Sequence, residues 1–149
     1  MNNRIPVAVQ LWSVKDDVTA DLPRTLEQLS EMGYEGVETA GLGRTSPEQW
    51  KKLLADNGLV ACGAHVGLDA LSPGAFDETI ETYGELGCRR FTVPALSEEY
   101  MRSLDGYRRA CAIINIAAAR AKKLGCSVGY HNHAFEFQFV ENHIIEIPI

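Results

Sequence analysis

The chain has 149 residues, of which 46% are hydrophobic and 23% are charged, and its formal net charge is −6. This composition indicates one soluble globular domain, and an acidic chain without a basic stripe argues against nucleic acid as a partner. No apolar run approaches the roughly 18 residues that span a membrane, and the first residues lack the apolar core of a signal peptide. We therefore expect a cytoplasmic protein with no membrane partner.

The cysteines are far apart in the sequence and form no CxxC pair. Cys62, Cys111 and Cys126 stand among apolar or small neighbours, so we predict reduced core thiols rather than a disulfide framework. Reduced thiols agree with the expected compartment.

Short apolar runs alternate with helical patterns in the first half of the chain. Residues 7–11 predict a strand, and apolar residues at steps of four and three over 22–32 predict a helix. Residues 36–38 predict a short second strand. A second helix is expected to follow Ser46, an N-cap with a proline and a capping-box glutamine after it, and to end at Asn57.

The second half continues the alternation with two helices and three strands. Ser72-Pro73 predicts the start of one helix, and Asp105 is the expected cap of a longer helix that closes at Gly125. The predicted strands cover residues 59–64, 90–94 and 127–130.

Five strands joined by four crossover helices require a parallel sheet, because such connections run right-handed between parallel neighbours. Gln10, Glu38, His65 and His131 fall at the C-terminal ends of successive strands, where a barrel gathers its active site from several loops. An open doubly wound sheet would concentrate ligand residues at one switch point, and no GxGxxG or GxxxxGK(S/T) motif supports nucleotide binding. We predict an α/β fold, a partial (β/α)8 TIM barrel with about five parallel strands and four helices.

The segment 129–137 places several ligand-type side chains at the end of the fifth strand. Because side chains alternate along a strand, His131 and His133 share a face, and Glu136 joins them only if the chain leaves strand geometry after His133. Two interpretations stay open. The histidines and Glu136 contact a metal or a substrate, or the histidines are hydrogen-bonded inside the barrel and Glu136 is a solvated loop carboxylate.

Four segments together resemble a known family. They are residues 10–14, 33–38, 63–67 and 129–137, in that order. In these motifs the sequence is similar to the sugar phosphate isomerase/epimerase family, the xylose isomerase-like TIM barrels. The resemblance extends from about residue 6 to residue 139 and corresponds to the N-terminal five-strand portion of such a barrel.

The resemblance implies a metal-dependent sugar or sugar phosphate isomerase or epimerase that moves a proton next to a sugar carbonyl. It implies a divalent ion, Mn, Mg, Co or Zn, held by a glutamate after the fifth strand and by ligands after the sixth, seventh and eighth strands. Many relatives carry Glu-Asn-His where this chain has His131-Asn132-His133, which leaves the metal ligand open between His131 and Glu136. We expect Glu136 and His133 to act in catalysis, and the metal site to be incomplete in this chain alone.

Four residues at earlier strand ends are candidates for substrate binding. His65 follows small neighbours that leave room for a ligand, and the alternative is a satisfied core histidine. Glu38 suits a substrate hydroxyl, the positioning of a histidine, or a structural salt bridge. Gln10 lies in an apolar strand and requires a polar partner, whereas Trp12 is either a pocket wall or an aromatic packed under the following loop.

The length conflicts with a complete barrel, which takes about 250 residues, so we expect a single truncated barrel domain over residues 1–149. A shortened gene and a fragment that pairs with another chain explain this equally well. Residues 138–149 are an atypical, β-branched tail that predicts a possible extra strand over a sheet edge, with Pro148 blunting its end. Because an open half-barrel exposes apolar edges, we expect a homo-oligomer.

Three function classes stay open from the sequence. The first is the isomerase or epimerase, or its N-terminal fragment. The second is a catalytically inactive half-barrel that binds a sugar or a partner chain. The third is an endonuclease that acts at abasic sites, which the acidic charge disfavours.

Overall fold

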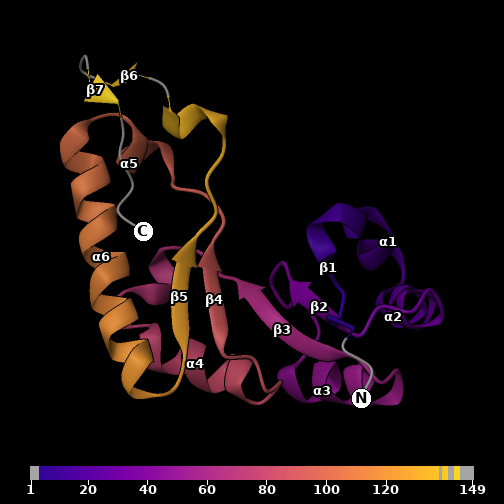
Figure 1. The fold of residues 1–149 in the computed structure, drawn as a ribbon. Coiled ribbons are helices and arrows are strands. Elements are labelled where there is room, and N and C mark those ends of the chain that lie inside the picture. The colour runs from indigo at the N-terminus through magenta and orange to yellow at the C-terminus, as the bar shows by residue number, and fades with distance from the viewer. Residues whose placement is uncertain (1–3, 138, 141–142, 145–149) are drawn as a thin grey trace. The chain divides into compact units, whose positions relative to one another are not determined.

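The computed structural model describes residues 4–137, 139–140 and 143–144 (Figure 1). The chain forms two compact units, which we call unit 1 (Met1–His65 and Glu81–Arg89) and unit 2 (Val66–Ile80 and Arg90–Ile149). Within each unit, strands and helices alternate in the predicted order.

Three parallel strands form the described sheet of unit 1. They are β1 (Ala8–Gln10), β2 (Gly36–Thr39) and β3 (Val60–His65). Gln10 lies opposite Glu38, and a register shift between Val37 and Glu38 sets Glu38 opposite Gly63. The carboxyl ends of these strands therefore meet at one edge of the sheet, where Gln10, Glu38 and His65 are found.

The helical segments of unit 1 between its strands are η1 (Leu11–Val14), α1 (Lys15–Ala20), α2 (Leu22–Glu31) and α3 (Pro47–Asp56). Helices α2 and α3 confirm the predicted helices to within one residue. The predicted capping box is present, because Ser46 accepts a hydrogen bond from the backbone N–H of Gln49 and the Gln49 side chain accepts one from the backbone N–H of Ser46. The segments η1 and α1 were not predicted, because they are too short to show a helical period.

A buried apolar core stabilises unit 1. Leu26 of α2, Val37 of β2 and Trp50 of α3 are each at most 2% exposed. Such burial contributes roughly 25 cal/mol per Å² of apolar surface, the main favourable term in folding. The indole N–H of Trp50 donates to the carbonyl oxygen of Leu42 at 3.0 Å, so the polar edge of this large side chain is satisfied.

Unit 2 contains the strands β4 (Arg90–Val93) and β5 (Ser127–Tyr130), which pair in parallel so that Val93 lies opposite Tyr130. The helix α6 (Leu104–Lys123) precedes β5 and lies along it (Figure 1). The other segments are η2 (Asp69–Leu71), α4 (Phe76–Gly84), α5 (Glu98–Met101) and η3 (Ala134–Phe137). The residues of α4 are divided between the two units.

Two helix starts differ from the sequence predictions. Ser103 and not Asp105 caps α6, because the Ser103 hydroxyl accepts a hydrogen bond from the backbone N–H of Gly106 at 3.1 Å. Asp105 lies in the first turn, where a negative charge interacts favourably with the helix dipole. Helix α4 begins at Phe76 rather than at Ser72-Pro73, since η2 and a turn come first. The short helices α1 and α5 also raise the count above the predicted four.

The tail was predicted as a possible extra strand over a sheet edge. Its described part instead forms a separate antiparallel pair of two-residue strands, β6 (Phe139–Val140) and β7 (His143–Ile144). Pro148 and the rest of that predicted strand lie outside the described residues.

The predicted α/β class is confirmed, with five strands that pair in parallel within their units. No disulfide joins the four cysteines, all of which lie in the described residues, and they are buried to different extents. Cys88 and Cys126 are buried, whereas Cys62 and Cys111 are only partly buried. Among the helices that the structure describes, none is long and apolar enough to span a membrane.

Candidate functional site

Gln10, Glu38 and His65 contact one another at the strand ends of unit 1. Nε2 of Gln10 lies 3.0 Å from Nδ1 of His65, and Nε2 of His65 lies 3.3 Å from Oε2 of Glu38. The side chain of His65 is 11% exposed and that of Glu38 is 28% exposed, so the pair is shielded but reachable from solvent. Three of the four predicted substrate-binding residues are thus neighbours.

The hydrogen bonds assign the protons of this cluster. The amide oxygen of Gln10 accepts a hydrogen bond from the backbone N–H of Trp12, so the Gln10 NH₂ group faces His65. Nδ1 of His65 is then the acceptor, and Nε2 carries the proton that points to Glu38. The three side chains form one chain of donors and acceptors that ends on a carboxylate oxygen.

Gly63 gives Glu38 the room to lie against His65. A Cβ atom at residue 63 would lie 2.8 Å from Oε1 and 3.3 Å from Cγ of Glu38. The small residues before His65 were expected to leave room for a ligand. At Gly63, the space is occupied by the carboxylate of the neighbouring strand.

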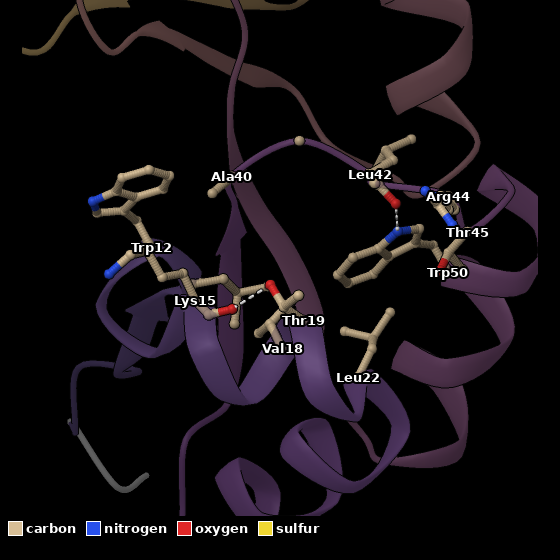
Figure 2. Close-up of a pocket in the computed structure, with 13 residues that line it drawn as sticks. Trp12, Lys15, Val18, Thr19, Leu22, Ala40, Leu42, Arg44, Thr45 and Trp50 are labelled. Atoms are coloured by element: carbon tan, nitrogen blue, oxygen red, sulfur yellow. Dashed lines mark hydrogen bonds between the residues drawn. The ribbon is translucent and has the colours of Figure 1, made fainter.

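Trp12, the fourth predicted substrate residue, lies at the wall of a hollow in unit 1 (Figure 2). Trp12 is 64% exposed. The hollow has a volume of about 680 Å³ and is also lined by Lys15, whose Nζ lies 5.5 Å from the centroid of the Trp12 ring. The structure therefore places Trp12 at a pocket wall rather than packed under the loop.

Glu136 is 1% exposed, and no other charged residue in the described part of the chain is buried. Its Oε1 accepts a hydrogen bond from the Tyr130 hydroxyl and its Oε2 accepts one from the backbone N–H of His133, both at 2.5 Å. A buried carboxylate is costly unless it is hydrogen-bonded, and bonds to an ionised acceptor are the stronger kind. Glu136 is therefore not the solvated loop carboxylate of the second interpretation.

The chain leaves strand geometry after Tyr130, where the predicted fifth strand ends, and so before His133. The strand β5 ends at Tyr130, the backbone N–H of His131 still donates to the Val93 carbonyl at 3.0 Å, and η3 then turns the chain. Strand alternation through His133 would have directed Glu136 to the opposite face. The turn instead returns Glu136 to Tyr130 and His133.

Burial raises the pKa of the Tyr130 hydroxyl well above its ordinary value, and the hydrogen bond to Glu136 raises this pKa further. Burial also raises the pKa of Tyr107, with a smaller contribution from the negative charge of Glu136. Both hydroxyls therefore keep their protons at neutral pH, and Tyr130 acts there as a hydrogen-bond donor.

Three rings stack in sequence after β5. The imidazoles of His131 and His133 are 4.7 Å apart with an interplanar angle of 9°, and His133 and Phe135 are 5.2 Å apart at 11°. Nδ1 of His133 lies 3.9 Å from Oε1 of Glu136, and the His133 side chain is 43% exposed. The imidazole thus reaches solvent beside a buried negative charge.

His131 and Glu136 were the expected metal ligands. In the part of the chain that the structure describes, no three His, Cys, Asp or Glu side chains are placed to hold a metal ion. Both oxygens of Glu136 already accept hydrogen bonds within the protein. The described residues do not fit a complete site for the divalent ion that the resemblance implies.

Sequence reasoning missed Tyr130 as the partner of Glu136, Gly63 as the space beside Glu38, and Lys15 and Arg44 at the hollow. Tyr130 lies within the segment 129–137, but no spacing rule predicts a contact across a turn. Lys15 follows Trp12 by three residues, a spacing that becomes informative only if that loop is known to be helical.

No protein-family model matches this sequence, and a search of curated proteins finds no match. Solved structures do match. A sugar phosphate isomerase/epimerase from Parabacteroides distasonis ATCC 8503 has a TM-score of 0.73 and 24% identity, over 94% of this chain and 56% of that chain. An L-ribulose 3-epimerase has a TM-score of 0.59 and 19% identity, over 84% and 48%. An AP endonuclease, family 2, from Brucella melitensis has a TM-score of 0.68 and 14% identity, over 85% and 55%.

The chain has the fold of part of a sugar phosphate isomerase/epimerase barrel. The resemblance expected from the sequence is confirmed at the level of the fold. The chain spans about half the length of these structures, between 48% and 56%. Because one barrel fold supports many reactions, function has to be argued from the residues.

We predict that Gly63→Ala separates Glu38 from His65. The added Cβ would require the Glu38 side chain to move, and because that side chain is flexible, stability should fall by less than about 1 kcal/mol. The imidazole NMR signals of His65 should shift. Gly84→Ala is the control, since its Cβ would meet nothing within 4 Å. An unchanged His65 spectrum in Gly63→Ala would contradict the prediction.

We predict that Tyr130→Phe destabilises the protein by about 1.5–3 kcal/mol, because the buried carboxylate of Glu136 loses a charge-assisted hydrogen bond. Urea unfolding followed by circular dichroism measures the change. Tyr100→Phe removes one hydroxyl from the same unit and should change stability by less than about 0.5 kcal/mol. Equal losses of unfolding free energy in the two variants would contradict the prediction.

The same variant should alter the alkaline stability profile. The pKa of Tyr130 is raised in the folded state, so the folded protein keeps this proton to higher pH than the unfolded chain does. In the unfolded chain, the tyrosine pKa is about 10. The stabilisation from this difference is full below that pH and is lost as the pH rises further. The decrease in stability at high pH should be smaller in Tyr130→Phe, because this variant lacks the hydroxyl that titrates.

Proposed function

We propose that this chain is a sugar or sugar phosphate isomerase or epimerase, or the N-terminal part of one, that moves a proton next to the sugar carbonyl. Support comes from the fold it shares with solved structures of such enzymes, and from a carboxylate–histidine pair at the strand ends of each unit. Removal of a proton beside a carbonyl requires a base, and histidine and carboxylate side chains are the usual ones.

The placement of His133 beside Glu136 carries the proposal. The His133 ring is partly exposed and available to a substrate, whereas Glu136 is 1% exposed and lies 3.9 Å from Nδ1 of that ring. In the proposed step, His133 takes a proton from the substrate carbon, and the buried carboxylate stabilises the imidazolium that forms. Return of the proton to the neighbouring carbon, together with transfer of the hydroxyl proton from that carbon's oxygen to the former carbonyl oxygen, gives an isomerase. An epimerase requires a second acid on the opposite face of the substrate carbon.

Glu136 acts in this proposal through His133. It holds the backbone N–H of His133 and the Tyr130 hydroxyl, so it also fixes the turn that presents the imidazole. Glu136 is therefore a positioning residue in this conformation, and His133 is the group that meets the substrate.

In unit 1, Glu38 is proposed to bind substrate hydroxyls. A carboxylate accepts up to about four hydrogen bonds, so the contact with His65 leaves capacity for a sugar. His65 and Gln10 orient the carboxylate, and Gln10 is itself held by the backbone N–H of Trp12.

Deuterium exchange tests the proposed reaction. The chain is incubated in D₂O with aldoses, ketoses and their phosphates, with EDTA or with Mn²⁺, Mg²⁺, Co²⁺ or Zn²⁺. NMR then follows loss of the proton on the carbon beside the carbonyl. We expect exchange with at least one sugar, and a decrease of about 10²–10⁴-fold in His133→Gln. Glu136→Gln should lower the rate less, because Glu136 acts through His133.

Glu99→Gln is the matched control, since it removes an exposed carboxylate from the same unit. Circular dichroism checks that each variant is folded. No exchange with any sugar under any metal condition, or wild-type exchange in His133→Gln, would contradict the proposal. Exchange that appears only with one added ion would assign the metal dependence.

An abasic-site endonuclease is the second candidate, because an AP endonuclease shares the fold. The net charge of −6 repels DNA phosphates and disfavours this activity. Cleavage of a duplex that carries one abasic site, without sugar exchange, would support it. A sugar that raises the melting temperature without any exchange would instead identify a half-barrel that only binds.

A further inference from the structure

The hollow of unit 1 is a second candidate site, formed by the helical connection after β1 and by the loop between β2 and α3. Its volume is about 680 Å³, and small-molecule pockets commonly enclose about 300–1,000 Å³ with mostly apolar walls. Figure 2 shows Trp12 and Lys15 at one end of the hollow and Trp50 at the other. The hollow thus extends from one indole ring to the other.

The walls between the two ends are largely apolar. Val18 and Thr19 of α1 lie between the two indole rings in Figure 2, and Ala40 and Leu42 line the hollow from the loop. The Thr19 hydroxyl donates to the Lys15 carbonyl oxygen at 2.7 Å, so its proton is used within the helix. The middle of the hollow therefore suits the apolar body of a ligand.

The far end of the hollow is fixed before any ligand binds. Trp50 is 2% exposed, and its indole N–H donates to the Leu42 carbonyl oxygen at 3.0 Å. The loop that carries Leu42 contains Gly41 at φ +87° and Gly43 at φ +60°, conformations that residues with a side chain rarely adopt. The loop therefore has a defined shape, and binding to it costs little ordering entropy.

The near end combines an exposed ring with a positive charge. Trp12 is 64% exposed, and Nζ of Lys15 lies 5.5 Å from the centroid of its ring. Arg44 lines the opposite end, beside Trp50 (Figure 2), so an acid group next to Trp12 meets Lys15 alone. Among the lining residues that the structure describes, none is acidic, although the whole chain carries a charge of −6. The near end therefore favours a negative group.

We propose that the hollow binds an organic acid with an aliphatic body, whose carboxylate contacts Lys15 and whose body extends from Trp12 toward Trp50. The charge of Lys15 attracts the acid group, and the body removes part of the Trp12 ring and of the apolar walls from water. All residues that line the hollow belong to unit 1, so its occupancy does not depend on the proton transfer proposed for His133.

A series of straight-chain carboxylates, from butanoate to decanoate, tests the site without turnover. The chain has two tryptophans and both line the hollow, so tryptophan emission reports on its occupancy. We expect a saturable blue shift below the micelle concentration. The dissociation constant should fall about two- to fourfold with each added CH₂ group until the body fills the hollow. A dissociation constant that does not change with chain length would overturn the proposal.

Ligands of equal chain length test the role of Lys15. Octanoate should bind more tightly than 1-octanol, and octylammonium should bind least, because Lys15 attracts a carboxylate and repels an ammonium group. Lys15→Ala should weaken octanoate binding about two- to fivefold, the range for an exposed ion pair, and leave 1-octanol binding unchanged.

Lys51→Ala is the matched control, since Lys51 is an exposed lysine of unit 1 that does not line the hollow. Tighter binding of octylammonium than of octanoate, or equal effects of Lys15→Ala and Lys51→Ala on octanoate binding, would contradict the proposal.

A larger side chain in the hollow locates the aliphatic body. Ala40 lines the hollow and is exposed, so Ala40→Leu should fold normally, which circular dichroism checks. Ala40→Leu should weaken decanoate binding at least about tenfold, which corresponds to about two CH₂ groups left in water. Ala55→Leu is the control, because Ala55 is exposed in unit 1 and does not line this hollow. Equal decanoate affinities of the two variants would place the acid elsewhere and overturn the proposal.

Discussion

Parallel pairing of the strands is the constraint on which the placement of every candidate residue depends. A parallel ladder directs the carboxyl ends of its strands to one edge, and buried strands favour polar side chains mainly at those ends. In unit 1 this pairing brings Gln10 into contact with His65, although 55 residues separate them. In unit 2 it sets Tyr130 opposite Val93, immediately before the turn that carries His133 and Glu136. The unit 1 cluster is a consequence of strand register, whereas the unit 2 cluster is formed by the turn that follows β5.

Electrostatics then decides what each cluster can do. Glu38 stays partly open to solvent and has only one side held by His65, which suits contact with a substrate hydroxyl. Glu136 is buried, and the two hydrogen bonds that offset its desolvation also fix the backbone of His133. Glutamate therefore has two roles in the proposed function. Glu38 faces a ligand, and Glu136 supports His133, which faces one. Tyr130, with its raised pKa, remains a donor to Glu136 at neutral pH.

The sequence predicted what depends on local pattern and missed what depends on a turn or a neighbouring strand. The strand order, the Ser46 capping box and the polar strand ends follow from periodicity and capping rules, and the structure confirms them. The end of β5 at Tyr130 was predicted, but strand alternation left open whether Glu136 joins His133, because a strand rule contains no information about the turn that follows. The role of Gly63 was missed because it depends on a side chain of the adjacent strand. Substrate, metal, self-association and cytoplasmic location stay predictions.

Hydrogen bonds to Glu136 are inferred to set the geometry at the end of β5 before any ligand binds. Amide hydrogen exchange at His133, measured by NMR on the free protein, tests this inference most directly. The backbone N–H of His133 should exchange at least about 10²-fold more slowly than an unprotected amide, and Glu136→Ala should abolish this protection. Exchange of the His133 amide at the unprotected rate in the wild-type protein would contradict it.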